Sequence, residues 1–228
     1  MNFIRVVCLT IVFSFLGSSI YALENDEIFI KKGNPKNKVI ALTFDDGPHP
    51  KETYEVLEVL KKHNVKATFF VAGKHVNWYT DVFLKTVSEG HEIGNHTFKH
   101  TNISNLSKSQ IEREIIECEK IIYDLTGKKT NIFRPPYGKY NEKELKEIAI
   151  ENGYNIVLWA TLDVMDWKNP SAYEIAKTVV DKAENGDIIL LHDYGTNNTV
   201  EALDILIPKM KEKGFEFVTV SDIIKELE

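Results

Sequence analysis

Short apolar segments rich in β-branched residues alternate along this chain with longer segments whose apolar residues recur at helical spacing. Strands that alternate with helices form a parallel sheet, because each helix returns the chain to the start of the next strand. This alternation limits the fold to the α/β class. The predicted strands are Val39–Phe44, Ala67–Val71, His91–Gly94, Asn131–Arg134, Asn155–Trp159, Asp187–Leu191 and Phe215–Val218.

The segments between these strands are predicted to be helices. No glycine-rich phosphate-binding loop follows the first strand, which argues against an open nucleotide-binding sheet. We therefore expect a distorted (β/α) barrel of about seven parallel strands in a single domain. The predicted helices are Glu52–His63, Tyr79–Glu89, Lys108–Leu125, Glu142–Glu151, Ala172–Lys182 and Val200–Lys213, with Ser221 capping a last helix.

The N-terminus has the features of a secretory signal peptide. A positive charge at Arg5 precedes the apolar run Val6–Leu16, and small residues lead to a cleavage site after Ala22. The apolar run is short for a membrane span, which needs roughly twenty residues, so an uncleaved anchor is the alternative. We expect a signal peptide over 1–22, a leader segment over 23–38 and the folded catalytic domain over 39–228.

Charge and cysteine content limit the possible partners and the cellular location of the chain. Without residues 1–22 the chain would hold 27 basic and 34 acidic residues, a formal charge of −7, which argues against a nucleic-acid partner. Cys118 would be its only cysteine, so no internal disulfide could form. A secreted or cell-surface chain without disulfides fits a bacterial cell envelope. We predict a monomer with no stable protein partner.

Polar and aromatic residues follow several of the predicted strands. Because the carboxyl ends of parallel strands meet at one rim of a barrel, we expect these side chains to converge there. Asp45 and Asp46 are neighbours, and two close carboxylates need a cation or hydrogen-bond donors to offset their repulsion. The residues are Asp45, Asp46, His96, His100, Arg134, Tyr137, Asp163, Asp166, Trp167, His192 and Asp193.

His96 and His100 are four residues apart, a spacing that brings two imidazoles to the same side of a turn. Two histidines and one carboxylate are the usual ligands of a catalytic zinc ion. If one of Asp45 and Asp46 binds the metal, the other is free to accept a proton from a metal-activated water.

Further residues complete a proton-transfer site. Arg134 is suited to keep a neighbouring carboxylate ionised. His192 is the candidate general acid, and Asp163 could hold its imidazole in one tautomer. The stiff Pro135–Pro136 pair could aim the backbone N–H of Tyr137 at a developing oxyanion.

Aromatic and apolar residues at the rim suit a sugar or small acyl group. Such a surface is supplied by Trp167, Tyr137, Trp159 and Leu191, although Trp159 is expected to be a core residue. The alternative for each is an ordinary place in the hydrophobic core.

Five stretches in order resemble the motifs of the polysaccharide deacetylases, the family of chitin and peptidoglycan N-deacetylases. The resemblance extends from about Val39 to Glu226. It implies a distorted (β/α) barrel, an amino-sugar polysaccharide substrate and a divalent metal, usually zinc but sometimes cobalt or nickel. The stretches are Thr43–Pro48, His96–His100, Arg134–Tyr137, Asp163–Trp167 and Leu191–Asp193.

The resemblance also implies a role for each residue. The first motif of this chain contains two adjacent aspartates, and in this it resembles family members that act on N-acetylglucosamine more than those that act on N-acetylmuramic acid. The implied roles are Asp45 as base, Asp46, His96 and His100 as metal ligands, Arg134 steadying Asp45, the Tyr137 amide at the oxyanion, His192 as acid tuned by Asp163, and Trp167, Leu191 and Pro136 as substrate contacts.

Two other functions stay open at this point. The chain could be a cell-wall or sporulation factor that binds glycan without turning it over. Two histidines and one carboxylate also describe a non-haem iron oxygenase, although oxygen chemistry has no need of the separate Asp45, Arg134 and His192 set.

Overall fold

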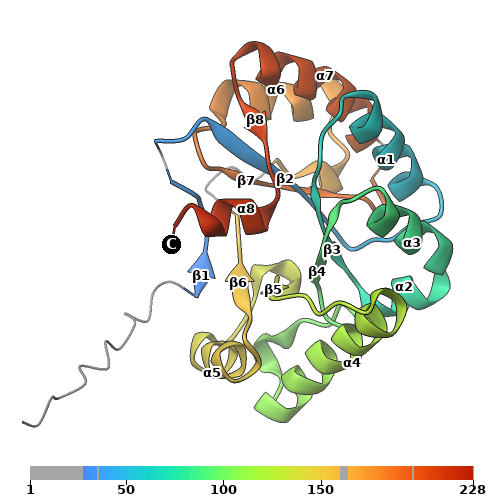
Figure 1. Cartoon of the computed structure of the whole chain (residues 1–228), viewed down its shortest axis with the longest axis vertical. Coiled ribbons are helices and arrows are strands. Elements are labelled where there is room, and N and C mark those ends of the chain that lie inside the picture. Colours follow the sequence, from blue (N-terminus) through green and yellow to red (C-terminus); the bar gives the residue numbers. More distant parts are fainter. Residues whose placement is uncertain (1–27, 35, 160–163, 197, 228) are drawn as a thin grey trace, which may run out of the picture.

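The computed structural model describes residues 28–34, 36–159, 164–196 and 198–227 of the chain (Figure 1). In this part of the chain, eight strands form one curled sheet, and helices cover its outer face. The pairs of neighbouring strands are parallel. The strands are β1 (Phe29–Ile30), β2 (Val39–Asp45), β3 (Thr68–Val71), β4 (Glu92–Asn95), β5 (Ile132–Phe133), β6 (Asn155–Val157), β7 (Ile188–His192) and β8 (Glu216–Phe217).

The helices follow the predicted positions, with one addition and one shifted start. The sequence does not predict α2, because its six residues are too few to display a helical repeat. Helix α8 is capped by the Thr219 hydroxyl rather than by Ser221. None of the described helices has the length and hydropathy that a membrane span requires. The helices are α1 (Glu52–Lys62), α2 (Gly73–Trp78), α3 (Thr80–Ser88), α4 (Lys108–Thr126), α5 (Glu142–Asn152), α6 (Ala172–Lys182), α7 (Thr199–Glu212) and α8 (Val220–Lys225), with short 3-10 turns η1 (Ile103–Asn105), η2 (Pro136–Gly138) and η3 (Asp166–Lys168).

Strand β2 lies between β3 and β7 and also pairs with β8, and all seven of its residues are buried. Burial on both faces explains why this segment is apolar throughout instead of alternating with polar residues. Its last residue, Asp45, is in register with Phe70 of β3 and His192 of β7. The carboxyl ends of these three strands therefore meet at one rim.

The two ends of the sheet approach each other just after β1. Strand β1 pairs with β6, so the predicted leader segment 23–38 contains a strand of the sheet. An antiparallel bridge joins Lys32 to Asp187, just before β7, and the Gly33 N–H donates to the Gly186 carbonyl oxygen at 2.7 Å. These contacts nearly close the sheet, which confirms the predicted distorted (β/α) barrel.

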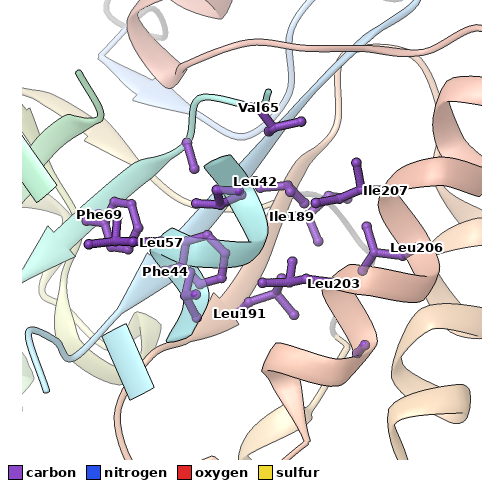
Figure 2. Close-up of a cluster of buried hydrophobic side chains, with 14 of the residues drawn as sticks. Leu42, Phe44, Leu57, Val65, Phe69, Ile189, Leu191, Leu203, Leu206 and Ile207 are labelled. Carbon is purple, nitrogen blue, oxygen red and sulfur yellow. The ribbon is translucent and has the colours of Figure 1, made fainter. Parts of the chain in front are cut away.

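The outer faces of β2 and β7 pack against α1 and α7 in a hydrophobic cluster (Figure 2). Side chains alternate along a strand, so the neighbours of these core residues point the other way, into the barrel. Asp45, next to Phe44, and His192, next to Leu191, are two such neighbours. The strand residues shown in the cluster are Leu42, Phe44, Phe69, Ile189 and Leu191, and the helical ones are Leu57, Leu203, Leu206 and Ile207.

Helix α8 lies over the amino-terminal end of the barrel (Figure 1). Val220 and Ile223 of this helix are fully buried in one cluster with Ala41, Phe70 and Ile188 from the inner face of the sheet. The interior therefore opens toward the carboxyl ends of the strands.

Candidate active site

Two neighbouring carboxylates reach the same cavity because the chain leaves strand geometry between them. Asp45 ends β2, and Asp46 has φ of 76°, in the left-handed region. The next residue, Gly47, makes a close approach: a Cβ atom there would lie 2.3 Å from Oδ2 of Asp193. This buried carboxylate accepts hydrogen bonds from the Gly47 N–H (3.1 Å) and the Thr53 hydroxyl (2.5 Å). The residue after His192 thus fixes the turn that presents both aspartates.

Asp45 is held by a fully buried arginine. Nη1 of Arg134 donates to Oδ1 of Asp45 (2.7 Å) and to the Thr43 hydroxyl (2.8 Å). Its Nε and Nη2 atoms donate to the carbonyl oxygens of Val157 and Leu158, both at 3.2 Å. Burial lowers the pKa of Arg134 and the charge of Asp45 opposes that shift, and a guanidinium keeps its proton in proteins. A permanent cation therefore stands behind the Asp45 carboxylate.

Asp46, His96 and His100 form a compact donor set. One carboxylate oxygen and two imidazole nitrogens lie within 4.8 Å of one another. Oδ1 of Asp46 is 2.9 Å from Nε2 of His100 and 3.4 Å from Nε2 of His96. Nδ1 of His96 donates to the Arg134 carbonyl oxygen at 2.7 Å, which leaves Nε2 as its lone-pair donor. This donor set fits a divalent cation such as zinc.

The surroundings of Asp46 favour its ionised form. Burial alone would raise the pKa of Asp46, but the hydrogen bonds and charges of His100 and His96 outweigh burial and hold that pKa well below its usual value. On the backbone side, Nδ1 of His75 lies 2.6 Å from the Asp46 carbonyl oxygen. Asp46 is thus both charged and oriented, as a metal ligand must be.

His192, at the end of β7, is held by Asp166. Its Nδ1 is 2.7 Å from Oδ1 of Asp166, while Oδ2 accepts from the His192 N–H and the Thr199 hydroxyl, both at 2.8 Å. Burial alone would lower the pKa of His192, but the hydrogen bond and charge of Asp166, with the charges of Asp45 and Asp46, raise that pKa to about 9. At neutral pH His192 is therefore an imidazolium.

Asp166 contacts His192, and the predicted contact of Asp163 stays untested. The sequence predicts Asp163 as the partner of His192, and Asp163 lies outside the described residues, whereas Asp166 is only 1% exposed. Both aspartates belong to one Asp-x-x-Asp-Trp stretch. Spacing alone does not reveal which of the two carboxylates reaches the imidazole.

These groups line one cavity of about 380 Å³. That volume suits a small ligand such as one sugar unit with its acyl group. Among the described residues, the strand-end residues assigned as base, acid and metal ligands converge there, and Trp167 joins them. The lining residues are Asp45, Asp46, His96, His100, Tyr137, Trp159, Trp167, Leu190 and His192.

Leu191 does not take the predicted place in this cavity. It is fully buried in the outer hydrophobic cluster, and the cavity is lined by its neighbour Leu190. Adjacent strand residues face opposite sides of a sheet, so Leu190 shares a face with His192 and Leu191 cannot. The predicted place of Leu191 in the cavity is therefore taken by Leu190.

The loop after β5 and the end of β6 add an aromatic wall. Tyr137 has φ of 62° and is 60% exposed, and its ring centroid lies 4.7 Å from that of His100. Pro136 is buried and is not one of the described residues that line the cavity, contrary to the predicted substrate contact. Trp159, predicted to be a core residue, lines the cavity beside Tyr137.

Several contacting residues are missing from the sequence prediction, among them Thr43, Leu190 and His75. Strand alternation was an available signal for two of them, because Thr43 lies two residues before Asp45 and Leu190 lies two residues before His192. His75 carries no such signal, since α2 itself is not predicted and its contact with Asp46 joins this helix to the turn after β2.

Comparisons with known proteins agree with this geometry. The family model of polysaccharide deacetylases matches residues 32–157. A peptidoglycan-N-acetylglucosamine deacetylase of Bacillus cereus is 42% identical over 195 residues, covering 84% of this chain and 91% of the relative. The peptidoglycan-N-acetylmuramic acid deacetylase PdaC of Bacillus subtilis is 37% identical over 191 residues, covering 83% of this chain and 39% of PdaC.

Solved structures show the same likeness. The Bc1960 peptidoglycan N-acetylglucosamine deacetylase matches with a TM-score of 0.84 at 37% identity, over 87% of this chain and 93% of that one. The BA3943 pseudoenzyme of Bacillus anthracis matches with a TM-score of 0.81 at 33% identity, over 87% of this chain and 69% of that one. Together, the family model, the relatives and the shared fold show that this chain belongs to the polysaccharide deacetylase family.

Proposed function

We propose that this chain hydrolyses the N-acetyl groups of peptidoglycan and releases acetate, using a divalent cation held by Asp46, His96 and His100. Zinc is the proposed cation, and N-acetylglucosamine units are the proposed substrate. Relatives named for N-acetylglucosamine reach 42% and 40% identity, against 39% and 37% for those named for N-acetylmuramic acid, which supports this choice.

One observation carries the proposal. A carboxylate backed by a cation and an imidazolium backed by a carboxylate line the same cavity as the donor set of Asp46, His96 and His100. Amide hydrolysis needs one group that accepts a proton from water and one that gives a proton to the departing nitrogen.

Each residue then has a task in the reaction. A bound cation would lower the pKa of a water molecule and polarise the amide carbonyl. Asp45 accepts the proton of the attacking water, and Arg134 keeps Asp45 in place. As the carbon–nitrogen bond breaks, His192 gives its proton to the amine, and acetate retains the water oxygen. The Tyr137 N–H is proposed to stabilise the negative carbonyl oxygen, and Leu190 with Trp167 to surround the acetyl methyl group.

We also propose where the chain works. Residues 1–22 act as a secretory signal, and the remaining chain acts as a monomer at the bacterial cell envelope. Sequencing the N-terminus of the secreted protein would test the cleavage after Ala22, and light scattering would test the monomer.

The purified chain should be incubated with peptidoglycan and with N-acetylglucosamine oligomers, each with added zinc, cobalt or nickel. We expect mass spectrometry to show losses of acetyl mass that match the acetate released and that disappear with a chelator. Acetate release that persists in full with the chelator would contradict the role of the cation.

A second candidate function is glycan binding without turnover, and the similarity to the BA3943 pseudoenzyme favours it. In that case the chain would sediment with peptidoglycan while no cation produced acetate. This outcome would reject the hydrolase and keep the glycan partner.

A further inference from the structure

We propose that a second sugar-binding surface lies beside the cavity and holds a neighbouring unit of the glycan chain. We call it the aromatic platform. This inference rests on the proposed function and specifies how a polymeric substrate would be held. The platform consists of His49, His75, Trp78, Tyr79 and Tyr194.

The rings of the platform support one another. His75 and Tyr194 stack almost in parallel, with centroids 4.3 Å apart and an interplanar angle of 3°. His49 meets Tyr194 edge-on at 5.0 Å, and Trp78 packs against His75 at 5.3 Å. Rings held by such contacts form a rigid surface, so binding to them costs little side-chain entropy.

The aromatic platform adjoins the cavity at two residues, His75 and Tyr194. His75, at the centre of the platform, contacts the carbonyl oxygen of Asp46, whose side chain lines the cavity. Tyr194 comes two residues after His192, which lines the same cavity. A glycan chain that leaves the cavity on the Asp46 side would therefore meet the exposed Trp78 ring, which packs against the buried His75.

Exposure of Trp78 argues for a ligand, whereas His75 beneath it is buried and the other three rings are partly buried. Trp78 ends α2 and is 60% exposed, as exposed as Tyr137 at the cavity itself. Large exposed aromatic groups that adjoin a cavity mark binding sites more often than scattered surface residues do. The apolar faces of sugar rings pack on aromatic rings, whereas their hydroxyl groups remain in water.

The size of the cavity leads to the same conclusion. Its volume of about 380 Å³ suits a single acetylated sugar, while the proposed substrate is a polymer. The neighbouring units must lie outside the cavity, on its rim. The aromatic platform offers them a surface on one side, and Tyr137 and Trp167, 60% and 54% exposed, flank the cavity itself.

Steady-state acetate release from N-acetylglucosamine oligomers of increasing length, from the disaccharide to the pentasaccharide, tests the platform. The wild-type chain should gain kcat/KM with length. In Trp78→Ala we expect kcat/KM on the longest oligomer to fall about three- to tenfold, mainly through KM, which is the scale of one stacked-ring contact. Trp78→Phe should restore most of the loss, because it keeps an aromatic ring.

Tyr123→Ala is the matched control. Tyr123 is also a large exposed aromatic residue, 48% exposed, but it lies in the last turns of α4, away from the rim. It should leave the length dependence unchanged. Circular dichroism of each variant would show that the fold is intact.

A Trp78→Ala variant whose length dependence matches the wild type would overturn the platform while leaving the deacetylase intact. If the wild-type chain releases no acetate from any oligomer, the proposed function fails instead. The platform could then still be tested by measuring, with calorimetry, the affinity of chelator-treated protein for the pentasaccharide. Equal affinities of the wild type and Trp78→Ala would reject the platform.

Discussion

Two charged pairs adjoin the cavity and orient opposite charges in the same way, and we call them its two walls: Asp45 with Arg134, and His192 with Asp166. On one wall the Asp45 carboxylate is held by Arg134, and both side chains are almost fully buried. On the other wall the His192 imidazolium is held by Asp166, and the His192 side chain is 14% exposed. In each case a partner of opposite charge stands behind the group that faces the cavity. In the proposed mechanism the first wall accepts a proton and the second donates one.

The walls differ in how they respond to pH. Arg134 keeps its charge across the accessible pH range, so its support of Asp45 does not titrate. The second wall depends on His192, whose pKa is raised to about 9, so it loses its charge within that range. The charge of the first wall is therefore independent of pH, whereas in the proposed mechanism the second wall sets the alkaline limit of the activity.

The largest effect is expected from Asp45→Asn. An amide cannot accept the proton of the attacking water, so kcat should fall by about 10²- to 10⁴-fold. Because Asp46, His96 and His100 are unchanged, the variant should retain its metal, as elemental analysis would show. A variant with near-normal acetate release would remove Asp45 from the proposed role.

Arg134→Met tests whether the first wall is also structural. It would leave the buried Asp45 without its cation, so the free energy of unfolding should drop by about 3–5 kcal/mol in a denaturant titration. Arg113→Met is the matched control, since Arg113 is an exposed arginine of α4, and its change should stay within about 0.5 kcal/mol. Equal effects of the two substitutions would contradict a special role for Arg134.

Asp166→Asn tests the second wall. Without the negative charge, the pKa of His192 should fall from about 9 toward its ordinary value near 6.5. The alkaline limb of the kcat profile should move to lower pH, because the imidazole must be protonated to act as an acid. At pH 8 the rate should drop roughly 10- to 100-fold, part of what a general acid contributes.

The same pair predicts a pH dependence of stability. Because the pKa of His192 is raised by folding, the stabilisation is fully present below pH 6.5 and is lost as pH rises through about 9. Asp166→Asn should flatten the unfolding free energy over this window. Asp204→Asn is the control: Asp204 forms a similar pair with His63 (2.6 Å) at the surface, and its loss should leave the kcat profile in place.

The fold and the site differed in how far sequence could predict them. Strand β2 was predictable because it is buried on both faces and ends in a glycine turn. Strand β1 was not, because a two-residue strand shows no periodic pattern and its pairing with β6 spans more than a hundred residues. The prediction that strand-end residues meet at one rim needed only the rule for parallel barrels.

Side-chain directions were harder to predict than positions. Loop residues such as Asp46 and Tyr137 adopt positive φ, and residue identity did not reveal that conformation. Asp166, which contacts His192, follows another such residue, Met165. The exchange of Leu191 for Leu190 has a different origin, because both lie in β7, where strict alternation would have assigned the cavity face to Leu190.

The smallest effect we predict, that of Thr43→Val, separates the function of the first wall from its stability. The Thr43 hydroxyl accepts from Arg134 (2.8 Å) and donates to the Ile189 carbonyl oxygen (2.7 Å). Valine has nearly the same shape but removes one hydrogen bond from each partner, so we expect a loss of about 1–2 kcal/mol in unfolding free energy and a severalfold drop in kcat. Thr68→Val is the control, because Thr68 is also fully buried and hydrogen-bonded, to Glu92, but lies at the start of β3, away from the rim. It should lose similar stability and keep kcat; a similar drop in kcat for both variants would mean that general destabilisation, and not the orientation of Arg134, limits the rate.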